Sequence, residues 1–344
     1  MHMLIKSSFS IVIITLLFAG CKKQNVAENI QIQTPKKFSP EYYANLRAYK
    51  KTDHQIFFGW FAAYANKEGV IADYKKSPSW GEHIAGLPDS MDICSLWMGV
   101  PSLKENDSLT TYNPIAYHEM RHAMEVRGIK MVMPVIVELE GKGYPINDSG
   151  LRAYSNHLID MVFDNDLDGL DIDWEPRSGT YLNNANNFAK MVQYCSERLG
   201  PMSGSGKLLI VDYYNHTLPT TIEPYINYLV NQAYTQGTTT NSAANLQTRY
   251  DRVSSWCPPH KFFVTENIGD WWQNGGSPFT EANGNTISPI DGSRMHSLEG
   301  MARWKPRQGQ KAGWGAFYFV RDYNSDPPYK YMRRAIQAVN PAVR

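Results

Sequence analysis

The fold is decided by the stretch LDGLDIDWEP, residues 167–176. Alternate side chains of a β-strand share one face, so a strand over 169–174 directs Asp171, Asp173 and Glu175 to the same side. Neighbours on that side are separated by about 6.6 Å along the strand. Three carboxylates this close in a poorly solvated interior cannot all ionise freely, so we expect at least one pKa to rise.

Seven other apolar runs have the continuous hydrophobicity of strands that are buried on both faces in a parallel sheet. They cover residues 55–61, 91–98, 130–137, 207–213, 228–233, 262–267 and 313–320. Amphipathic stretches with helical spacing lie between several of them, at 114–127, 149–164, 183–199, 241–256 and 296–305. Eight strands with interposed helices predict a (β/α)8 TIM barrel in a single domain. The competing doubly wound sheet needs a Gly-rich phosphate turn, which Gly59-Trp60-Phe61 does not provide.

The N-terminal segment is expected to lie outside the barrel. Residues 1–20 carry one base, Lys6, before an apolar run that is too short to span a bilayer, which is typical of a signal peptide. Small residues lead directly into Cys21, so the segment resembles a bacterial lipoprotein signal with Cys21 as the lipidated residue. The alternative is an ordinary signal peptide. We expect 21–38 to be anchor and linker, 39–344 to be the barrel domain, and the protein to lie in the bacterial envelope, facing either the periplasm or the exterior.

Charge and cysteine content exclude several classes of protein. The chain has 34 basic and 33 acidic residues, and loss of Lys6 with the leader equalises them. A balanced charge provides no basic field for nucleic acid. The remaining cysteines, Cys94, Cys195 and Cys257, are widely separated and lack zinc spacing, so we interpret them as buried thiols and leave one disulfide open. His118 and His122 have helical spacing but no third ligand, and we expect no metal and no cofactor.

The acidic strand resembles a known family. Residues 168–175, DGLDIDWE, match the DxxDxDxE signature of glycoside hydrolase family 18, which contains chitinases and endo-β-N-acetylglucosaminidases on (β/α)8 barrels. The resemblance implies substrate-assisted hydrolysis, in which the 2-acetamido oxygen of the substrate attacks the anomeric carbon. It implies that Glu175 is the proton donor, that Asp173 orients the acetamido group and that Asp171 tunes Asp173. Asp168 has the opposite parity and is expected to be structural. A row of hydrogen-bonded acids and a cation site are the alternatives.

Further site residues follow from the same resemblance. Tyr234 stands where the family holds the acetamido carbonyl, and Gln232 shares its parity. We expect Tyr213 or Asn215 to contact the −1 sugar and Tyr318 to replace the usual floor tryptophan. Trp271, on a long loop, suits sugar stacking, although a hydrophobic plug is equally compatible. Independently of the resemblance, the strand assignment places Glu138 and Glu266 at the ends of two strands on the catalytic face, where each either binds sugar hydroxyls or caps a helix.

The sequence therefore favours a lipid-anchored, retaining endo-β-N-acetylglucosaminidase that cleaves the core of glycoprotein N-glycans. The short segment 268–312 leaves no room for the added domain of processive chitinases. The alternatives are a chitinase and a surface glycan-binding protein on a catalytically weak barrel. We expect a monomer whose partners are N-glycans or GlcNAc-containing oligosaccharides, with the membrane contacted only through the lipid.

Overall fold

The computed structural model describes residues 37–62, 83–104, 108–234 and 241–341. They fall within one compact unit that spans Gln33–Arg344. The expected leader, Cys21 and nearly all of the linker lie outside the described residues. The first described helix begins directly after Ser39, whose side chain accepts a hydrogen bond from Tyr42 N and caps the helix.

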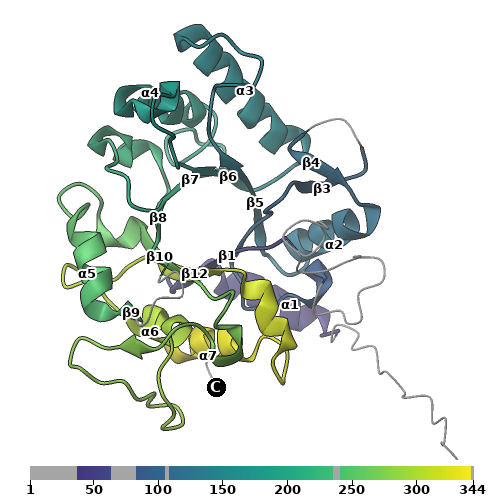
Figure 1. Ribbon diagram of the computed structural model, residues 1–344. Helices are drawn as coiled ribbons and strands as arrows, with labels where there is room; N and C mark the ends of the chain where they lie inside the picture. Colours follow the sequence, from purple (N-terminus) through teal and green to yellow (C-terminus); the bar gives the residue numbers. More distant parts are fainter. Residues whose placement is uncertain (1–36, 63–82, 105–107, 235–240, 342–344) are drawn as a thin grey trace, which may run out of the picture. The chain divides into compact units, whose positions relative to one another are not determined.

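Eight parallel strands close into a barrel, which confirms the predicted fold class (Figure 1). Closure by pairing of the last strand with the first excludes the doubly wound open sheet. All eight strands lie within the predicted runs, and all but one are shorter than the run that predicts them. They are β1 (Ile56–Trp60), β2 (Ile93–Ser95), β5 (Lys130–Ile136), β6 (Gly169–Asp173), β7 (Leu208–Tyr213), β8 (Tyr228–Gln232), β10 (Phe262–Asn267) and β12 (Gly313–Phe317).

Helices surround the barrel (Figure 1). They are α1 (Pro40–Tyr49), α2 (Pro114–Glu125), α3 (Asp148–Asp164), α4 (Ala185–Ser196), α5 (Ala243–Asp251), α6 (Ser297–Arg303) and α7 (Lys330–Val339). Short 3-10 helices connect them: η3 (Ile84–Gly86), η4 (Tyr181–Asn183), η5 (Thr220–Tyr225), η6 (Pro259–Lys261), η7 (Trp272–Asn274) and η8 (Phe319–Asn324). Helix α7 was not predicted; buried Asp322, which accepts from Met332 N at 2.8 Å, fastens its first turn.

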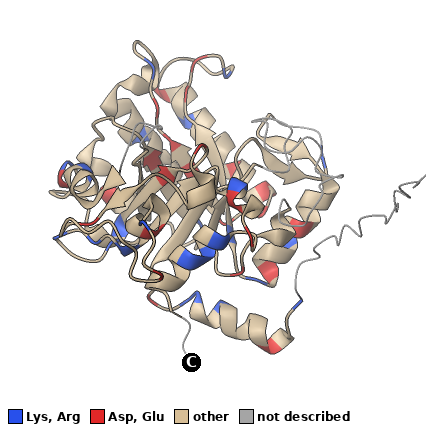
Figure 2. Ribbon diagram, turned by 60° about the horizontal axis from the view of Figure 1, so that its bottom comes forward, with Lys and Arg blue, Asp and Glu red and all other residues tan. Residues whose placement is uncertain are grey.

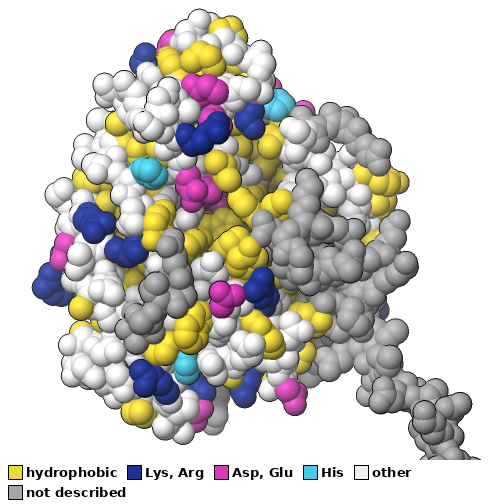
Figure 3. Space-filling view, viewed as in Figure 1, with side chains coloured by type: hydrophobic (Ala, Val, Ile, Leu, Met, Phe, Trp, Pro, Cys, Tyr) yellow, Lys and Arg dark blue, Asp and Glu magenta, His cyan; other side chains and the backbone are white. Residues whose placement is uncertain are grey.

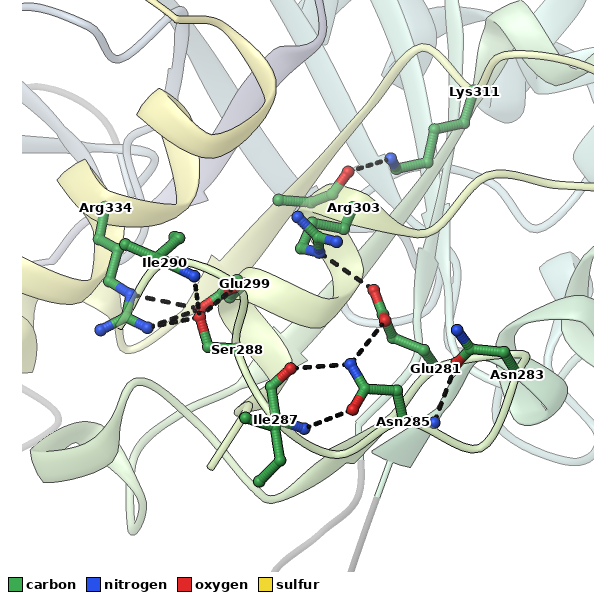
Figure 4. Close-up of polar contacts among 11 residues, drawn as sticks. Glu281, Asn283, Asn285, Ile287, Ser288, Ile290, Glu299, Arg303, Lys311 and Arg334 are labelled. Atoms are coloured by element: carbon green, nitrogen blue, oxygen red, sulfur yellow. Dashed lines mark hydrogen bonds and ion pairs between the residues drawn. The ribbon is translucent and has the colours of Figure 1, made fainter. Parts of the chain in front are cut away.

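Two short strand pairs lie outside the barrel. They join β3 (Val100–Ser102) to β4 (Thr110–Tyr112), and β9 (Asn241–Ser242) to β11 (Phe279–Thr280). The second pair attaches the segment between β10 and α6 to β9. Further polar contacts hold the same segment in place (Figure 4). Glu281 accepts from Arg303 at 3.0 Å, and Arg334 of α7 donates to Glu299 at 3.1 Å and to Ser288 at 2.7 Å. This segment is thus part of the barrel's wall and not an added domain.

The barrel interior is filled by side chains that alternate with those of the outer core. Its apolar part includes Phe58, Trp60, Ile210, Val230 and Phe263, and the larger outer core lies between strands and helices. Glycines at the inward positions of β12 make room for these rings. A Cβ on Gly313 would lie 2.3 Å from the Phe263 ring, and one on Gly315 would lie 2.0 Å from Phe58 O.

The distribution of charges, cysteines and histidines in the structure can be compared with the sequence-based expectations. Basic and acidic residues are mixed over the ribbon (Figure 2). Cys94, Cys195 and Cys257 are buried free thiols, as predicted, so none of them forms a disulfide. His118 and His122 lie on the exposed face of α2. Within the described ranges, no helix combines the length and apolar composition that crossing a bilayer requires.

The close approach at Gly315 makes a prediction about stability. Gly315→Ala should lower the free energy of unfolding by about 3 kcal/mol, because the added methyl group forces β12 away from β1. Chemical denaturation monitored by tryptophan fluorescence measures this loss. Gly204→Ala is the control, since Gly204 has a φ of +69° and open space around it, and should cost about 1 kcal/mol. Equal losses in both variants would contradict the packing explanation.

Candidate active site

The acidic strand delivers its carboxylates as its alternation predicts. Asp171 and Asp173 point into the barrel, with 0% and 6% of their surfaces exposed. Glu175 follows two residues after the end of β6 and is exposed. The C-terminal ends of barrel strands are where active sites are built. The strand therefore carries one acid deep in the interior, one near its mouth and one in contact with solvent.

Asp171 is held by neutral donors that reach it across the barrel interior from β1 and β2. Trp60 Nε1 on β1 donates to Asp171 Oδ2 at 3.1 Å, and Ser95 Oγ on β2 donates to the same oxygen at 2.7 Å. Burial raises the pKa of Asp171 to about 6, against the lowering effect of these hydrogen bonds. Neither donor was singled out from the sequence, because a tryptophan and a serine in separate strands carry no motif.

A fourth carboxyl group, Asp212, completes the cluster and was missed by the sequence analysis. Asp212 on β7 is fully buried and in register with Asp173. Burial, followed by the charges of Asp173 and Asp171, raises its pKa well above the usual range. Burial also raises the pKa of Asp173 to about 8, with the charges of Glu175 and Asp171 acting in the same direction. The expected rise in pKa within the acidic row is confirmed.

Two predicted residues of β8 lie against this cluster. Gln232 is buried and its Nε2 donates to Asp173 Oδ1 at 3.3 Å and to Asp212 Oδ1. Tyr234 follows on the same face. Burial and then the charges of Asp212 and Asp173 raise the pKa of its phenol, which places that phenol close to both carboxyl groups. The amide of Gln232 is therefore committed to the acids, and Tyr234 stands at the mouth.

The prediction for the end of β7 was wrong about Tyr213. Its ring lies in the outer core, with 4% of its surface exposed, because the inward face of β7 carries Leu208, Ile210 and Asp212. The next inward position belongs to Tyr214, whose ring centroid lies 6.4 Å from that of Tyr234. The alternative, Asn215, is exposed and accepts hydrogen bonds from Arg249 and Arg252 at 3.4 and 3.5 Å.

The prediction that Tyr318 forms the sugar floor also needs correction. Strand β12 ends at Phe317, and Tyr318 follows it with a φ of +56° and its ring centroid 4.0 Å from that of Phe317. The guanidinium of Arg321 covers its ring at 4.5 Å. Phe317 occupies the inward position instead, stacked at 6.2 Å with Tyr234 and edge-on to Trp60 and Trp97 at 6.2 and 6.0 Å.

The other predicted residues are distributed around the barrel end. Glu138 has the inward parity of β5 and forms an ion pair with Arg177. Trp271 is half-buried, and within the described structure its Nε1 has no hydrogen-bond partner. Glu266 lies behind β10, fully buried, where it accepts from Asn241 and Ser277, so its predicted position on the catalytic face was wrong. Asp168 accepts from Met131 N at 2.8 Å and is structural, as its parity predicts.

The cluster has the chemistry of proton transfer. No group of three or more His, Cys, Asp or Glu among the described residues is arranged to hold a metal ion. The view into the barrel shows acidic side chains with hydrophobic ones around them near the middle of the face (Figure 3). One solvent-exposed acid beside buried acids of raised pKa is an arrangement suited to proton exchange with a bound molecule.

A family model described as glycoside hydrolase family 18, BT1044-like, matches residues 23–338. The chain belongs to glycoside hydrolase family 18. Two solved structures share its barrel. One is designated BT1044, with 23% identity, a TM-score of 0.68 and coverage of 91% of this chain and 97% of that one. The other is an endo-β-N-acetylglucosaminidase from Cordyceps militaris, with 25% identity, a TM-score of 0.62 and coverage of 90% and 98%.

Curated relatives of this family 18 enzyme carry a related activity in their names. Endo-beta-N-acetylglucosaminidase F2 of Elizabethkingia meningoseptica is 26% identical over 81% of this chain and 77% of its own length. Endo-beta-N-acetylglucosaminidase EndoS of Streptococcus pyogenes serotype M1 is 28% identical, but the match spans only 31% of that longer protein. The Cordyceps structure contains fucosyl-N-acetylglucosamine-Asn, bound to a variant of that enzyme.

The position of Phe317 in this glycoside hydrolase can be tested directly. Phe317→Ala should lower kcat/KM on an N-glycan or GlcNAc oligosaccharide about tenfold, because the sugar loses an aromatic surface at the barrel mouth. Tyr318→Ala should change it less than about threefold. Steady-state kinetics measures both, with thermal unfolding to verify folding. A larger loss for Tyr318→Ala would restore Tyr318 as the floor.

Proposed function

We propose that this family 18 enzyme is a retaining, substrate-assisted endo-β-N-acetylglucosaminidase that cleaves the GlcNAc-β1,4-GlcNAc core of N-linked glycans. The observation that carries the proposal is the graded burial of Asp171, Asp173 and Glu175 along β6, with Tyr234 beside them. In this proposal Glu175 protonates the leaving oxygen and then accepts a proton from the incoming water. The names of the curated relatives support the same activity.

A substrate-assisted route agrees with the burial of the remaining acids. Asp173, with its pKa raised to about 8, holds a proton through much of the neutral range. A neutral, buried carboxyl group is a poor nucleophile, but it can hydrogen-bond an amide. In the proposed reaction the acetamido oxygen attacks the anomeric carbon, Asp173 orients the acetamido N–H, and Tyr234 holds the acetamido carbonyl.

Cleavage of N-glycans is favoured over chitin by the walls of the site. Residues 268–312 form a fixed wall with one short strand, one 3-10 helix and one α-helix, and this fully described stretch contains no inserted domain. The inward end of β12 carries Phe317, where chitinases of the family usually place a tryptophan. Both features fit a short oligosaccharide core better than a long polymer track.

The proposed function predicts a specific product. Incubation with an N-glycosylated protein should release the glycan and leave one GlcNAc on asparagine. Glu175→Gln should lower this turnover about a thousandfold, since the proton donor is lost, and should retain glycan binding. Mass spectrometry of protein and released glycan measures both results.

The control variant is Glu197→Gln, which changes an exposed glutamate paired with Arg152 on the outer helices and should leave the rate unchanged. Equal rates on chitotetraose and N-glycan would favour the chitinase alternative. Glycan binding without turnover in the wild type would favour the surface glycan-binding protein. A sugar oxazoline accepted as a glycosyl donor would support the substrate-assisted route.

We also propose that the chain is a lipoprotein of the bacterial envelope, anchored through Cys21. The proposal rests on the apolar run and the small residues before Cys21. Metabolic labelling with a fatty-acid analogue should mark the wild type and not Cys21→Ser. The variant should move from the membrane fraction to the soluble fraction. Membrane retention of unlabelled Cys21→Ser would contradict lipid anchoring at this residue.

A further inference from the structure

Asp212 is a buried acid that forms no ion pair with any residue the structure describes. It lies on β7 directly opposite Asp173, and 0% of its surface is exposed. Among the described residues, no lysine, arginine or histidine forms an ion pair with Asp171, Asp173 or Asp212, and no cation contributes to the shift of the Asp212 pKa. A buried carboxylate without a cation is costly, so the group must be stabilised in another way.

The hydrogen bonds around Asp212 leave two oxygens unsatisfied. Gln232 Nε2 donates hydrogen bonds to Asp212 Oδ1 and Asp173 Oδ1. Trp60 and Ser95 both donate to Asp171 Oδ2. Asp212 Oδ2 and Asp171 Oδ1 are buried, and within the described structure neither receives a hydrogen bond. An ionised carboxylate only accepts hydrogen bonds, whereas a protonated one donates. One proton shared between these two acids satisfies both oxygens.

We propose that Asp212 is a positioning residue that keeps its proton during the reaction and donates a hydrogen bond through it to the acidic side chains of β6. Gln232 holds one oxygen of Asp212, so its O–H is directed toward the acidic row. This hydrogen bond fixes Asp171 and Asp173 in place without adding a charge. No bond to the substrate is formed or broken by Asp212, and its proton is not consumed.

The groups that face Asp212 determine how activity should depend on pH. They are Asp171 and Asp173 from β6, Gln232 from β8, and Tyr234, which follows β8. Burial keeps the pKa of Asp212 well above its usual range, while its hydrogen bond lowers the pKa of Asp173 from what burial alone would give. Activity should fall at alkaline pH as Asp173 loses its proton, so the position of this alkaline limb reports on Asp212.

The test compares Asp212→Asn with Asp212→Leu. The asparagine amide donates a hydrogen bond as the protonated carboxyl does, so kcat should stay within about threefold of the wild type and the alkaline limb should not move. Leucine has no donor, so kcat should fall on the order of tenfold or more with KM little changed. Its alkaline limb should move to higher pH, because Asp173 loses a hydrogen bond that favours its charged form.

Asp168→Asn is the control, since Asp168 directly precedes β6 but faces away from the barrel interior, and it should leave the pH profile unchanged. An ionised Asp212 would give a different result. Asparagine would then remove a negative charge, move the alkaline limb to lower pH and damage kcat as much as leucine does. Either of those two outcomes overturns the proposal.

A second measurement is independent of turnover, because the kinetic test rests on the proposed function. Infrared spectra at pH 7 should show the C=O stretch of a protonated carboxyl in the folded wild type, and Asp212→Asn should lose part of that band. An unchanged band overturns the protonated state of Asp212. If the wild type cleaves no glycan, the proposed function fails, and the infrared result still decides the state of Asp212.

Discussion

Asp173 and Asp212 lie opposite each other on β6 and β7, almost completely removed from water. Transferring an ionised carboxylate out of water costs several kcal/mol unless a counter-charge or hydrogen bonds compensate. The described barrel interior offers neutral donors: Trp60, Ser95 and Gln232. Neutral donors reduce the cost but do not cancel several negative charges, so protons must remain on part of the cluster. The raised pKa values of the cluster are therefore a consequence of the residues that surround it.

The rest of the barrel keeps this cluster dry and fixed. Aromatic rings fill the interior below the acids, and the glycines of β12 allow these rings to pack against the strand backbone. Above the acids, Phe317 and Tyr234 stack at the mouth. Part of the aromatic surplus in the sequence is thus structural, filling the interior, and part is available at the mouth for a sugar ring.

The barrel and the acidic row could be predicted because both depend on local pattern. Eight apolar runs specify strands, and alternating acids within 167–176 specify their own orientation. The run Leu208 to Tyr213 gave no such information, because its first four residues are all apolar and either face could point inward. Only the register with β6 shows that Asp212 faces in and Tyr213 faces out. The sequence also pointed to Tyr318 where the structure presents Phe317, and the cause is different. The outcome depends on where β12 ends and on the positive φ of Tyr318, a backbone conformation that the propensity of a non-glycine residue does not predict.

The spacing of the motif explains how one strand can supply acids with opposite requirements. An acid that exchanges protons with substrate and water must contact solvent, whereas a group that stays neutral beside it must not. Two residues advance the strand by about 6.6 Å while keeping the same face. That step is enough to pass from Asp173, inside the barrel, to Glu175, outside it. The alternation keeps both carboxyl groups on one line toward the substrate, and the end of the barrel gives them different solvation. The same step in the other direction reaches Asp171, which has no exposed surface and whose charge raises the pKa of Asp173.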